Sequence, residues 1–288
     1  MAIKITPLET GMGARVTEID LRTPANDADF AAIQDALDTH LLLSFPDQQI
    51  DAPQQVAFAK RFGPLDIHVL EQYNHPEYPE IFMLSNEVVD GKPLGMSDAG
   101  SYWHSDFAFR PQPAYTTMLH AKKIPSRGGN TVFADTYAAY DALDAETRNT
   151  LIGRRAVQRY RKRSDTLGKG TGVNMTSDQE ARTPDVAHPL IRAHPKTGRN
   201  SIFAPIGTTA EIQGLPADES AEILKMLFGH IIDDRFVSEY SWTVGDLVFW
   251  DNRFTQHKAT SDQLSGDESR TLFRTTSMGE VPIMGKER

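Results

Sequence analysis

Many short strand-like segments, separated by turn signals, limit the folds that this chain can adopt. The segments alternate apolar with polar residues or form short apolar runs, as strands of a half-buried or buried sheet do. Steps such as Asp90-Gly91 and Gly128-Gly129 mark turns between them. The strand-like segments fall within residues 3–21, 41–45, 81–135, 188–192, 201–203 and 242–276. This pattern predicts a mainly β fold with flanking helices, of the sandwich or jelly-roll type.

Helical spacing of apolar residues occurs near the front of the chain and in two later segments. Phe30, Ile33 and Leu37 share one helix face. Asp51-Ala52-Pro53 opens a second helix, which Gly63-Pro64 ends. The helices expected are residues 27–40, 51–62, 137–152, where Asp144 caps the second half, and 217–233.

A long segment without periodicity interrupts this pattern. Residues 160–187 have little apolar content and carry glycines at positions 168, 170 and 172. Long loops in compact domains are often active-site lids or binding loops. We expect residues 1–288 to form one domain with a lid in this segment, and a surface insertion without a role is the alternative.

The absence of cysteine narrows the chemistry that this chain of 288 residues can perform. It excludes disulfides, thiolate metal sites and cysteine nucleophiles, so a metal must be held by His, Asp or Glu. The net charge of −9 argues against a general nucleic-acid or acidic-membrane binder, because a polyanion is repelled on average. The basic cluster in residues 154–163 is then a solvated face or a subunit contact. No apolar stretch reaches the roughly 18 residues of a membrane span, so a cytoplasmic enzyme is expected.

One His-x-Asp pair stands in an aromatic, strand-like setting. In Trp103-His104-Ser105-Asp106 the histidine and the aspartate are two residues apart, so a strand turns both side chains to one face. Such a pair can place two ligands on one metal ion, although the spacing alone is common. His75-Pro76-Glu77 has the same spacing but lies among prolines in a loop, and we do not expect it to bind metal.

A third candidate ligand follows an apolar strand near the C-terminus. This strand ends in Asp251-Asn252-Arg253, and His257 comes four residues later. Two imidazoles and one carboxylate on one face of an octahedral ion leave three positions open. Iron(II) oxygenases use these positions for a bidentate cosubstrate and for oxygen, whereas a structural metal site closes its shell. His104, Asp106 and His257 are therefore the predicted iron ligands.

Two arginines on one face of a late strand form the third part of the pattern. In Arg270-Thr271-Leu272-Phe273-Arg274 both guanidinium groups point the same way if the segment is a strand. Buried arginines are unfavourable unless paired, and a planar guanidinium binds a carboxylate or sulfonate through two hydrogen bonds. We interpret both as anion receptors beside the metal. Surface positions, or a salt bridge to Asp246 or Asp251, are the alternative.

These residues and several further segments resemble the taurine dioxygenase family, which includes the 2,4-dichlorophenoxyacetate dioxygenases. The match covers most of the chain, and its segments occur in the family's order. The matching segments are residues 13–21, 58–65, 103–106, 128–131, 138–143 and 250–253, together with His257. The resemblance implies a double-stranded β-helix (jelly-roll) core with iron near its mouth, held by His104, Asp106 and His257.

The resemblance also implies roles for four further residues. Arg270 corresponds to the arginine that pairs with the distal carboxylate of 2-oxoglutarate, and Thr131 to a hydroxyl that hydrogen-bonds it. Arg274 corresponds to a residue that holds an anionic group of the primary substrate, and His68 to a histidine that assists it. The implied cofactors are iron(II), the cosubstrate 2-oxoglutarate and O2. The implied assembly is a dimer or tetramer.

Three positions depart from the pattern of the taurine enzymes. An asparagine of those enzymes is Gly100 here, an aromatic pocket residue aligns near Thr208, and a tyrosine expected after His68 falls on Glu71. The anion-binding arginine is kept while the rest of the pocket differs. A substrate other than taurine is therefore expected.

The sequence thus predicts an iron(II)- and 2-oxoglutarate-dependent dioxygenase that hydroxylates a small anionic organic substrate, namely an alkyl or aryl sulfonate or a sulfate ester. Succinate and CO2 are released, and the hydroxylated product collapses to an aldehyde or ketone. An aryloxyalkanoate substrate is the alternative within this class. Two other classes stay open: an enzyme of another type that uses the same metal ligands, and a jelly roll that merely binds an anion.

Overall fold

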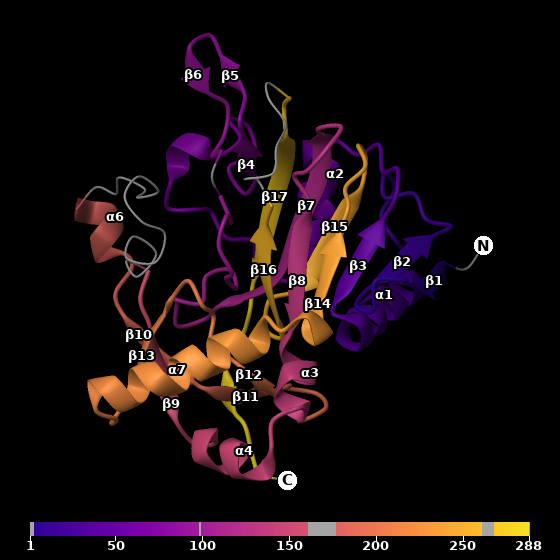
Figure 1. The fold of residues 1–288 in the computed structure, drawn as a ribbon. Coiled ribbons are helices and arrows are strands. Elements are labelled where there is room, and N and C mark those ends of the chain that lie inside the picture. Colours follow the sequence, from indigo (N-terminus) through magenta and orange to yellow (C-terminus); the bar gives the residue numbers. More distant parts are fainter. Residues whose placement is uncertain (1–2, 98, 161–176, 261–267, 288) are drawn as a thin grey trace.

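A seven-stranded sheet forms the largest layer of the molecule (Figure 1). The computed structural model describes residues 3–97, 99–160, 177–260 and 268–287. Neighbouring strands of this sheet run antiparallel, except that β2 and β3 are parallel. In spatial order the strands are β1 (Lys4–Pro7), β2 (Ala14–Thr17), β3 (Leu42–Phe45), β15 (Leu247–Asp251), β7 (Ala114–Lys123), β17 (Thr271–Met278) and β4 (Phe82–Ser85).

A smaller antiparallel sheet shares its apolar core with the large one. Its strands are β14 (Val237–Tyr240), β8 (Thr131–Asp135) and β16 (Thr255–Ala259). Phe133 of β8 packs in one cluster with Leu119, Trp250 and Leu272 of the large sheet. Two antiparallel sheets around one core form the expected jelly roll, and the prediction of a mainly β fold with flanking helices is confirmed.

Three further strand groups lie outside this core. They are β10 (Val186–Pro189), β9 (Arg155–Gln158) and β13 (Thr209–Ile212); β12 (Asn200–Ile202), β11 (Ile191–Ala193) and β18 (Ile283–Met284); and the hairpin of β5 (Val88–Val89) and β6 (Lys92–Pro93). The hairpin projects from the top of the molecule in Figure 1. The C-terminal strand β18 is antiparallel to β11, which ties the end of the chain to the lower part of the structure.

Strand β15 shows why the large sheet is buried on both faces. Val248 and Trp250 point into the core between the two sheets. Leu247 and Phe249, which alternate with them, belong to a second cluster on the opposite face. Because successive strand residues point to opposite faces, an uninterrupted apolar run of this kind requires a cover on each side.

Two helices provide the cover on the outer face of the large sheet (Figure 1). These are α1 (Asp27–His40) and α2 (Ala52–Lys60). Ile33 and Phe58 of these helices join Phe249 in the second cluster. The Asn26 side chain caps α1, and Asp51 forms a capping box at the start of α2, so both helices begin near the predicted residues.

Helices α3 (Thr136–Asp141), α4 (Ala145–Leu151) and α7 (Ala217–Ile231) lie in the lower part of the molecule (Figure 1). Helix α7 packs Leu224, Leu227 and Ile231 against Tyr140 and Ile212. No helix in the described part of the chain is long and apolar enough to cross a membrane. The remaining helical segments are α6 (Ser177–Ala181) and the 3-10 turns η1 (Glu71–Tyr73) and η2 (Asp234–Phe236).

Several segments differ from the sequence prediction. The helix expected at 137–152 is two helices, α3 and α4, because Asp144 caps the second and accepts a hydrogen bond from the Thr147 amide. Strands β9, β13, β14 and β18 were not predicted, and β9 lies between β10 and β13 in its small sheet. Of the segment 160–187, predicted as one loop, the described part contains α6 and the start of β10. Residues 161–176 lie outside the described residues, so the lid stays a prediction.

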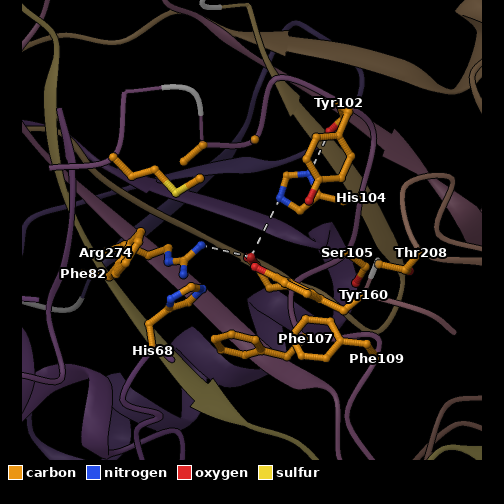
Figure 2. A pocket seen from close by; sticks show the side chains of 14 residues that line it. His68, Phe82, Tyr102, His104, Ser105, Phe107, Phe109, Tyr160, Thr208 and Arg274 are labelled. Carbon is orange, nitrogen blue, oxygen red and sulfur yellow. Dashed lines mark hydrogen bonds and ion pairs between the residues drawn. The ribbon is translucent and has the colours of Figure 1, made fainter. Parts of the chain in front are cut away.

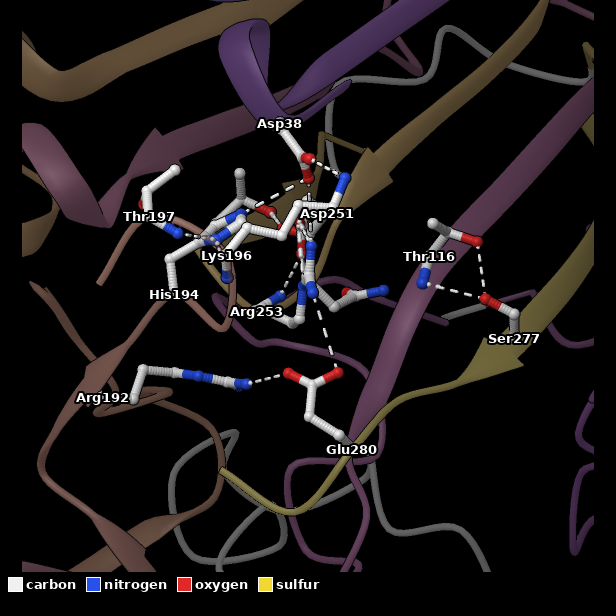
Figure 3. Close-up of polar contacts among 12 residues, drawn as sticks. Asp38, Thr116, Arg192, His194, Lys196, Thr197, Asp251, Arg253, Ser277 and Glu280 are labelled. Carbon is white, nitrogen blue, oxygen red and sulfur yellow. Dashed lines mark hydrogen bonds and ion pairs between the residues drawn. The ribbon is translucent and has the colours of Figure 1, made fainter. Parts of the chain in front are cut away.

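A largely buried ion network joins distant parts of the fold, among them β15 of the large sheet, α1 and β11 (Figure 3). Arg253 donates to both carboxylate oxygens of the fully buried Asp251, at 2.9 Å from Nε to Oδ1 and 2.7 Å from Nη2 to Oδ2. The same guanidinium lies 3.4 Å from Asp38 of α1 and 3.7 Å from Glu280. Glu280 also pairs with the buried Arg192 of β11. Burial alone would lower the pKa of Arg253, but the charge of Asp251 raises it above its usual value.

Removing the centre of this network should weaken the whole fold. Arg253→Ala leaves Asp251 buried without its partner, and breaking a buried ion pair in this way costs about 3–5 kcal/mol. We expect urea denaturation to show a loss of that size in the free energy of unfolding. Arg235→Ala, which breaks the exposed pair with Asp233, should change the free energy of unfolding little. Equal losses in the free energy of unfolding for Arg253→Ala and Arg235→Ala would contradict the assignment of Arg253 as the centre of a stabilising buried network.

Candidate metal centre and active site

A single β-bridge brings together two histidines that are far apart in the sequence. The His104 amide donates to the His257 carbonyl at 3.0 Å, and the His257 amide donates back to the His104 carbonyl at 2.8 Å. His257 lies on β16, which is held in place by its pairing with β8. The predicted strand around His104 is thus reduced to this one bridge, and Asp106 begins a turn. The backbone still directs all three predicted ligands to one place.

The three side chains form a compact group of potential metal ligands. Their ligand atoms lie within 4.8 Å of one another, and all three residues are buried. His104 Nε2 is 3.8 Å from Asp106 Oδ1, and His257 Nε2 is 3.7 Å from Asp106 Oδ2. Among the described residues this is the one cluster of three or more such side chains. It could therefore hold a metal ion on one face of its coordination shell.

The hydrogen bonds around the histidines favour metal binding through Nε2. His104 Nδ1 lies 2.7 Å from the Tyr102 carbonyl, which can only accept. Nδ1 therefore carries the proton, and Nε2 presents its lone pair toward Asp106. The ring of His257 is packed against Trp250 and Phe133, with ring centroids 4.5 and 6.0 Å away. Aromatic packing thus fixes the orientation of the second imidazole.

The charges around Asp106 keep its carboxyl group ionised. Burial alone would raise its pKa, but the positive charge of Arg274 lowers the pKa below the usual range of an aspartate. Arg274 Nη1 donates to Asp106 Oδ1 at 3.2 Å. Burial lowers the pKa of His257 well below its usual value. A carboxylate and a neutral imidazole are the forms that bind a divalent metal.

Arg270 lies buried next to the same cluster and has no carboxylate partner among the described residues. Its Nε donates to the Gly129 carbonyl at 2.8 Å. Gly128 and Gly129 both have φ near +70°, which glycine adopts readily, and this turn brings the Gly129 carbonyl to the arginine. Burial lowers the pKa of Arg270 to about 10. An unpaired buried cation of this kind is suited to binding an anion.

A cavity of about 370 Å³ connects Arg270 with the histidines. Its lining includes His104, His257, Thr131, Arg270 and Arg274. The Thr131 hydroxyl accepts a hydrogen bond from Trp242 Nε1 at 3.0 Å, so its own proton can be donated to another group. The alternative that the two arginines lie on the surface or pair with Asp246 or Asp251 is therefore wrong.

A second cavity, of about 510 Å³, opens on the other side of the cluster (Figure 2). Arg274 and His68 line one side of it, and Figure 2 shows both directed toward its centre. The Arg274 guanidinium lies over the ring of Phe82, 4.8 Å from its centroid, and 5.8 Å from that of Phe107. The His68 ring lies tilted against the Phe82 ring, with centroids 4.2 Å apart. His68 Nδ1 accepts a hydrogen bond from the Leu70 amide at 3.1 Å.

Aromatic side chains line much of this second cavity, and the sequence reasoning missed them. Phe107 and Phe109 lie side by side, with centroids 6.1 Å apart, and Tyr160 is 4.4 Å from Phe109. Tyr102 completes the wall, because Gly207 leaves room for its ring where a Cβ atom would lie 2.2 Å away. The high density of aromatic residues between Trp103 and Phe109 could have predicted an aromatic wall beside the metal ligands. Tyr160 gave none, since its neighbours along the chain are basic.

The positions that depart from the taurine pattern also find physical explanations. Gly100 has φ +74°, and a Cβ atom there would meet the His104 ring at 3.2 Å. Thr208 lines the second cavity and donates to Gln158. Glu71 lies in η1, exposed, 3.5 Å from Arg182. His75, predicted not to bind metal, instead accepts backbone hydrogen bonds through Nδ1 in its own loop.

Comparison with known proteins agrees with this geometry. The model of the family described as "Taurine catabolism dioxygenase TauD, TfdA family" matches residues 4–276. The alpha-ketoglutarate-dependent 2,4-dichlorophenoxyacetate dioxygenase of Cupriavidus pinatubonensis is 35% identical over 295 residues, which cover 98% of this chain and 100% of that protein. The chain belongs to the TauD/TfdA family.

Solved structures support the same assignment. The crystal structure of a taurine dioxygenase from Burkholderia xenovorans has a TM-score of 0.82 at 27% identity and covers 100% of this chain and 95% of that one. The crystal structure of AAD-2 in complex with Mn(II) and N-oxalylglycine has a TM-score of 0.79 at 29% identity and covers 98% and 100% of the two chains. This TauD/TfdA protein is an alpha-ketoglutarate-dependent dioxygenase and uses iron(II), 2-oxoglutarate and O2.

The unpaired charge of Arg270 predicts a gain in stability when it is removed. The fall in its pKa from 12.5 to about 10 corresponds to roughly 3 kcal/mol. Loss of the hydrogen bond to the Gly129 carbonyl offsets about 1 kcal/mol of that gain in stability. Arg270→Met should therefore raise the free energy of unfolding of the metal-free protein by about 1–2 kcal/mol in urea titrations.

Arg274→Met is the matched control, because it also removes a guanidinium from this cavity. Arg274 is paired with Asp106, so its loss leaves a buried carboxylate and should lower the free energy of unfolding. If Arg270→Met were as destabilising as Arg274→Met, Arg270 would not be an unpaired cation.

Proposed function

We propose that His104, Asp106 and His257 bind iron(II) and that the protein hydroxylates a small anionic organic substrate. One observation carries this proposal: two of the three potential ligands, His104 and His257, line the same cavity as a buried arginine that has no carboxylate partner in the described structure. A metal-binding hydrolase or isomerase has no use for such a cation at this position. Intact ligands likewise argue against a jelly roll that merely binds an anion.

The chain's own residues account for the binding of 2-oxoglutarate in the cavity beside Arg270. The Arg270 guanidinium binds the distal carboxylate, and the free proton of the Thr131 hydroxyl is donated to the same group. The apolar side chains of Leu84, Leu119 and Trp250 exclude water along the rest of the cavity. When bound, iron(II) with 2-oxoglutarate and O2 supplies the oxidation that hydroxylates a substrate C–H bond and releases succinate and CO2.

The second cavity is the proposed site of the primary substrate. Arg274, assisted by His68, binds its anionic group and directs the rest of the molecule between the metal ligands and the aromatic wall. A sulfonate or a sulfate ester fits this receptor. The wall of Phe82, Phe107 and Phe109 favours a substrate with an aryl group over one with a short alkyl chain.

An aryloxyalkanoate is the second candidate, and two observations favour it. The aromatic wall suits its ring, and the relative at 35% identity is named for an aryloxyacetate. In each case hydroxylation occurs at a saturated carbon that carries a hydrogen and bears the sulfonate sulfur, the sulfate-ester oxygen or the ether oxygen. The new hydroxyl group then loses its proton and becomes the carbonyl oxygen of an aldehyde or ketone, while the bond from that carbon to sulfur or oxygen breaks and the leaving group takes the electron pair. Assembly as a dimer or tetramer stays a prediction.

The two arginines should have separable roles in catalysis. Arg270→Ala removes the partner of the 2-oxoglutarate carboxylate, and loss of a buried charged hydrogen bond of this kind costs 2 kcal/mol or more. We expect the KM for 2-oxoglutarate to rise on the order of 100-fold, with a smaller effect on the primary substrate. Arg274→Ala should show the reverse, a raised KM for the primary substrate.

Each variant is the control for the other, because both remove a guanidinium from the cavity next to the metal ligands. The measurement is succinate formation at varied concentrations of one substrate while the other is saturating. Identical changes in both KM values for the two variants would refute the division of roles.

A substrate panel tests the proposed function itself. Purified protein with iron(II), ascorbate and 2-oxoglutarate is given alkyl sulfonates, aryl-bearing sulfonates, sulfate esters and aryloxyacetates, and substrate-dependent succinate is measured. Aryl-bearing anions should give higher kcat/KM than alkyl anions of equal charge, and Phe109→Ala should reduce that preference about tenfold. Controls omit O2 or the primary substrate. Absence of substrate-dependent succinate throughout the panel would count against the proposal.

A further inference from the structure

Asn252 and Thr117 form a closed ring of hydrogen bonds with the candidate metal ligand Asp106. The Asp106 amide donates to Asn252 Oδ1 at 3.2 Å. Asn252 Nδ2 donates to Thr117 Oγ1 at 2.8 Å, and Thr117 Oγ1 donates to Asp106 Oδ2 at 2.6 Å. The ring therefore starts at the backbone of Asp106 and ends at its carboxylate.

The direction of every bond in this ring is determined by chemistry. Trp250 Nε1 also donates to Asn252 Oδ1, at 3.1 Å, and an indole N–H and a backbone N–H can only donate. Asn252 Oδ1 must therefore accept, which leaves Nδ2 as the donor to Thr117. Because Thr117 Oγ1 receives that hydrogen, its own single proton is directed to Asp106. If the Asn252 amide were flipped, its NH2 group would face the Asp106 amide and Trp250 Nε1, which are both donors, and neither bond could form.

Burial makes the ring rigid. Thr117 is 0% exposed, Asn252 1% and Asp106 5%, so water does not compete for these bonds. Ser105, the residue between two candidate ligands, is also tied to Asn252, since its hydroxyl donates to the Asn252 carbonyl at 2.6 Å. Asn252 itself follows β15, and Thr117 lies on the neighbouring strand β7. The carboxylate is thus held against rotation by two adjacent strands of the large sheet.

The other oxygen of Asp106 faces different groups. Oδ1 lies 3.2 Å from Arg274 and 3.8 Å from His104 Nε2. Arg274 also lies on the large sheet, in β17, and its long side chain lines the second cavity. The Thr117 side chain is short, and its proton is directed to Asp106 because Asn252 donates to its oxygen.

From this ring we infer that Thr117 and Asn252 are positioning residues of the metal site: they hold the Asp106 carboxylate in the orientation that binds the metal. The inference rests on the proposed function, in which Asp106 is a ligand. Hydrogen-bond partners of metal ligands typically contribute 10- to 100-fold to metal affinity. The effect is on binding of the metal and precedes any effect on turnover.

The experiment measures binding of Mn(II) alone to metal-free protein, from the electron paramagnetic resonance signal of the free ion. Thr117→Val removes the hydroxyl and keeps the shape, and it should raise the Kd for Mn(II) at least 10-fold. Thr117→Ser restores the hydroxyl and should stay within about threefold of wild type. Thr117→Ala replaces the valine variant if that protein does not fold.

Thr116→Val is the matched control. Thr116 is the adjacent residue on β7, is 1% exposed, and its hydroxyl contacts Ser277 rather than Asp106 (Figure 3). Removing the Thr116 hydroxyl should lower the free energy of unfolding about as much as Thr117→Val does, and it should leave the Kd for Mn(II) within about twofold of wild type. Asn252→Ala should weaken Mn(II) binding in the wild-type background and add less than about twofold to Thr117→Val.

The outcomes separate the inference from the proposed function. If wild-type protein does not bind Mn(II), the proposed metal site fails and the inference fails with it. If wild type binds but Thr117→Val binds equally well, the inference alone is overturned. Equal losses in Thr116→Val and Thr117→Val, or additive losses for Asn252→Ala and Thr117→Val, would also overturn it.

Discussion

The reciprocal backbone bonds between His104 and His257 are the interaction on which the site depends. They join the loop that carries His104 and Asp106 to β16, the edge strand of the small sheet that carries His257. The candidate ligands come together only when these two segments pair. Once the two backbones are paired, the ring orientations follow from local contacts: a carbonyl at Nδ1 of one imidazole and the Trp250 ring against the other. The jelly roll matters to chemistry mainly because it provides this bridge and a dry core beside it.

The distribution of charge around the bridge separates structural from functional cations. Arg253 is neutralised by Asp251 of β15 within the fold and also lies near Asp38 of α1 and Glu280. Arg270 is as well buried but bonds only to a backbone carbonyl among the described residues. Desolvation of an unpaired guanidinium lowers the free energy of unfolding of the ligand-free protein. Binding of a dicarboxylate would pair the guanidinium and raise the free energy of unfolding again. In the proposed function, this unpaired cation is the feature that selects for an anion in the cavity beside Arg270.

Local signals and the family resemblance allowed much of this to be predicted from the sequence. Helix α1 and the capping box of α2 follow from spacing and cap residues, and His104, Asp106 and His257 from the resemblance and the chemistry of ligand types. What could not be predicted depends on non-local pairing. Strands β9 and β13 are short and pair with segments far along the chain, so their periodicity was too weak to read. The Asn252–Thr117 ring needs the register between β15 and β7, which no local pattern specifies.

The two cavities share four lining residues, Ala99, Gly100, His104 and Arg274, but the rest of each lining comes from different parts of the chain. The cavity of the proposed 2-oxoglutarate site is formed by a Gly-Gly turn, β8 and the start of β17, all tied to the sheets by backbone bonds. The aromatic wall of the second cavity is carried by Phe82 of β4, by the turn after Asp106, where Phe107 has φ +52°, and by Tyr160. Under the proposed function, substitutions at Phe109 or Tyr160 would alter the shape presented to the substrate without removing a member of the β-bridge or of the ring at Asp106. Of the departures from the taurine pattern, Thr208 lines the second cavity, whereas Gly100 lines both cavities. In that proposal the cosubstrate site stays constant while the aromatic wall selects among anions.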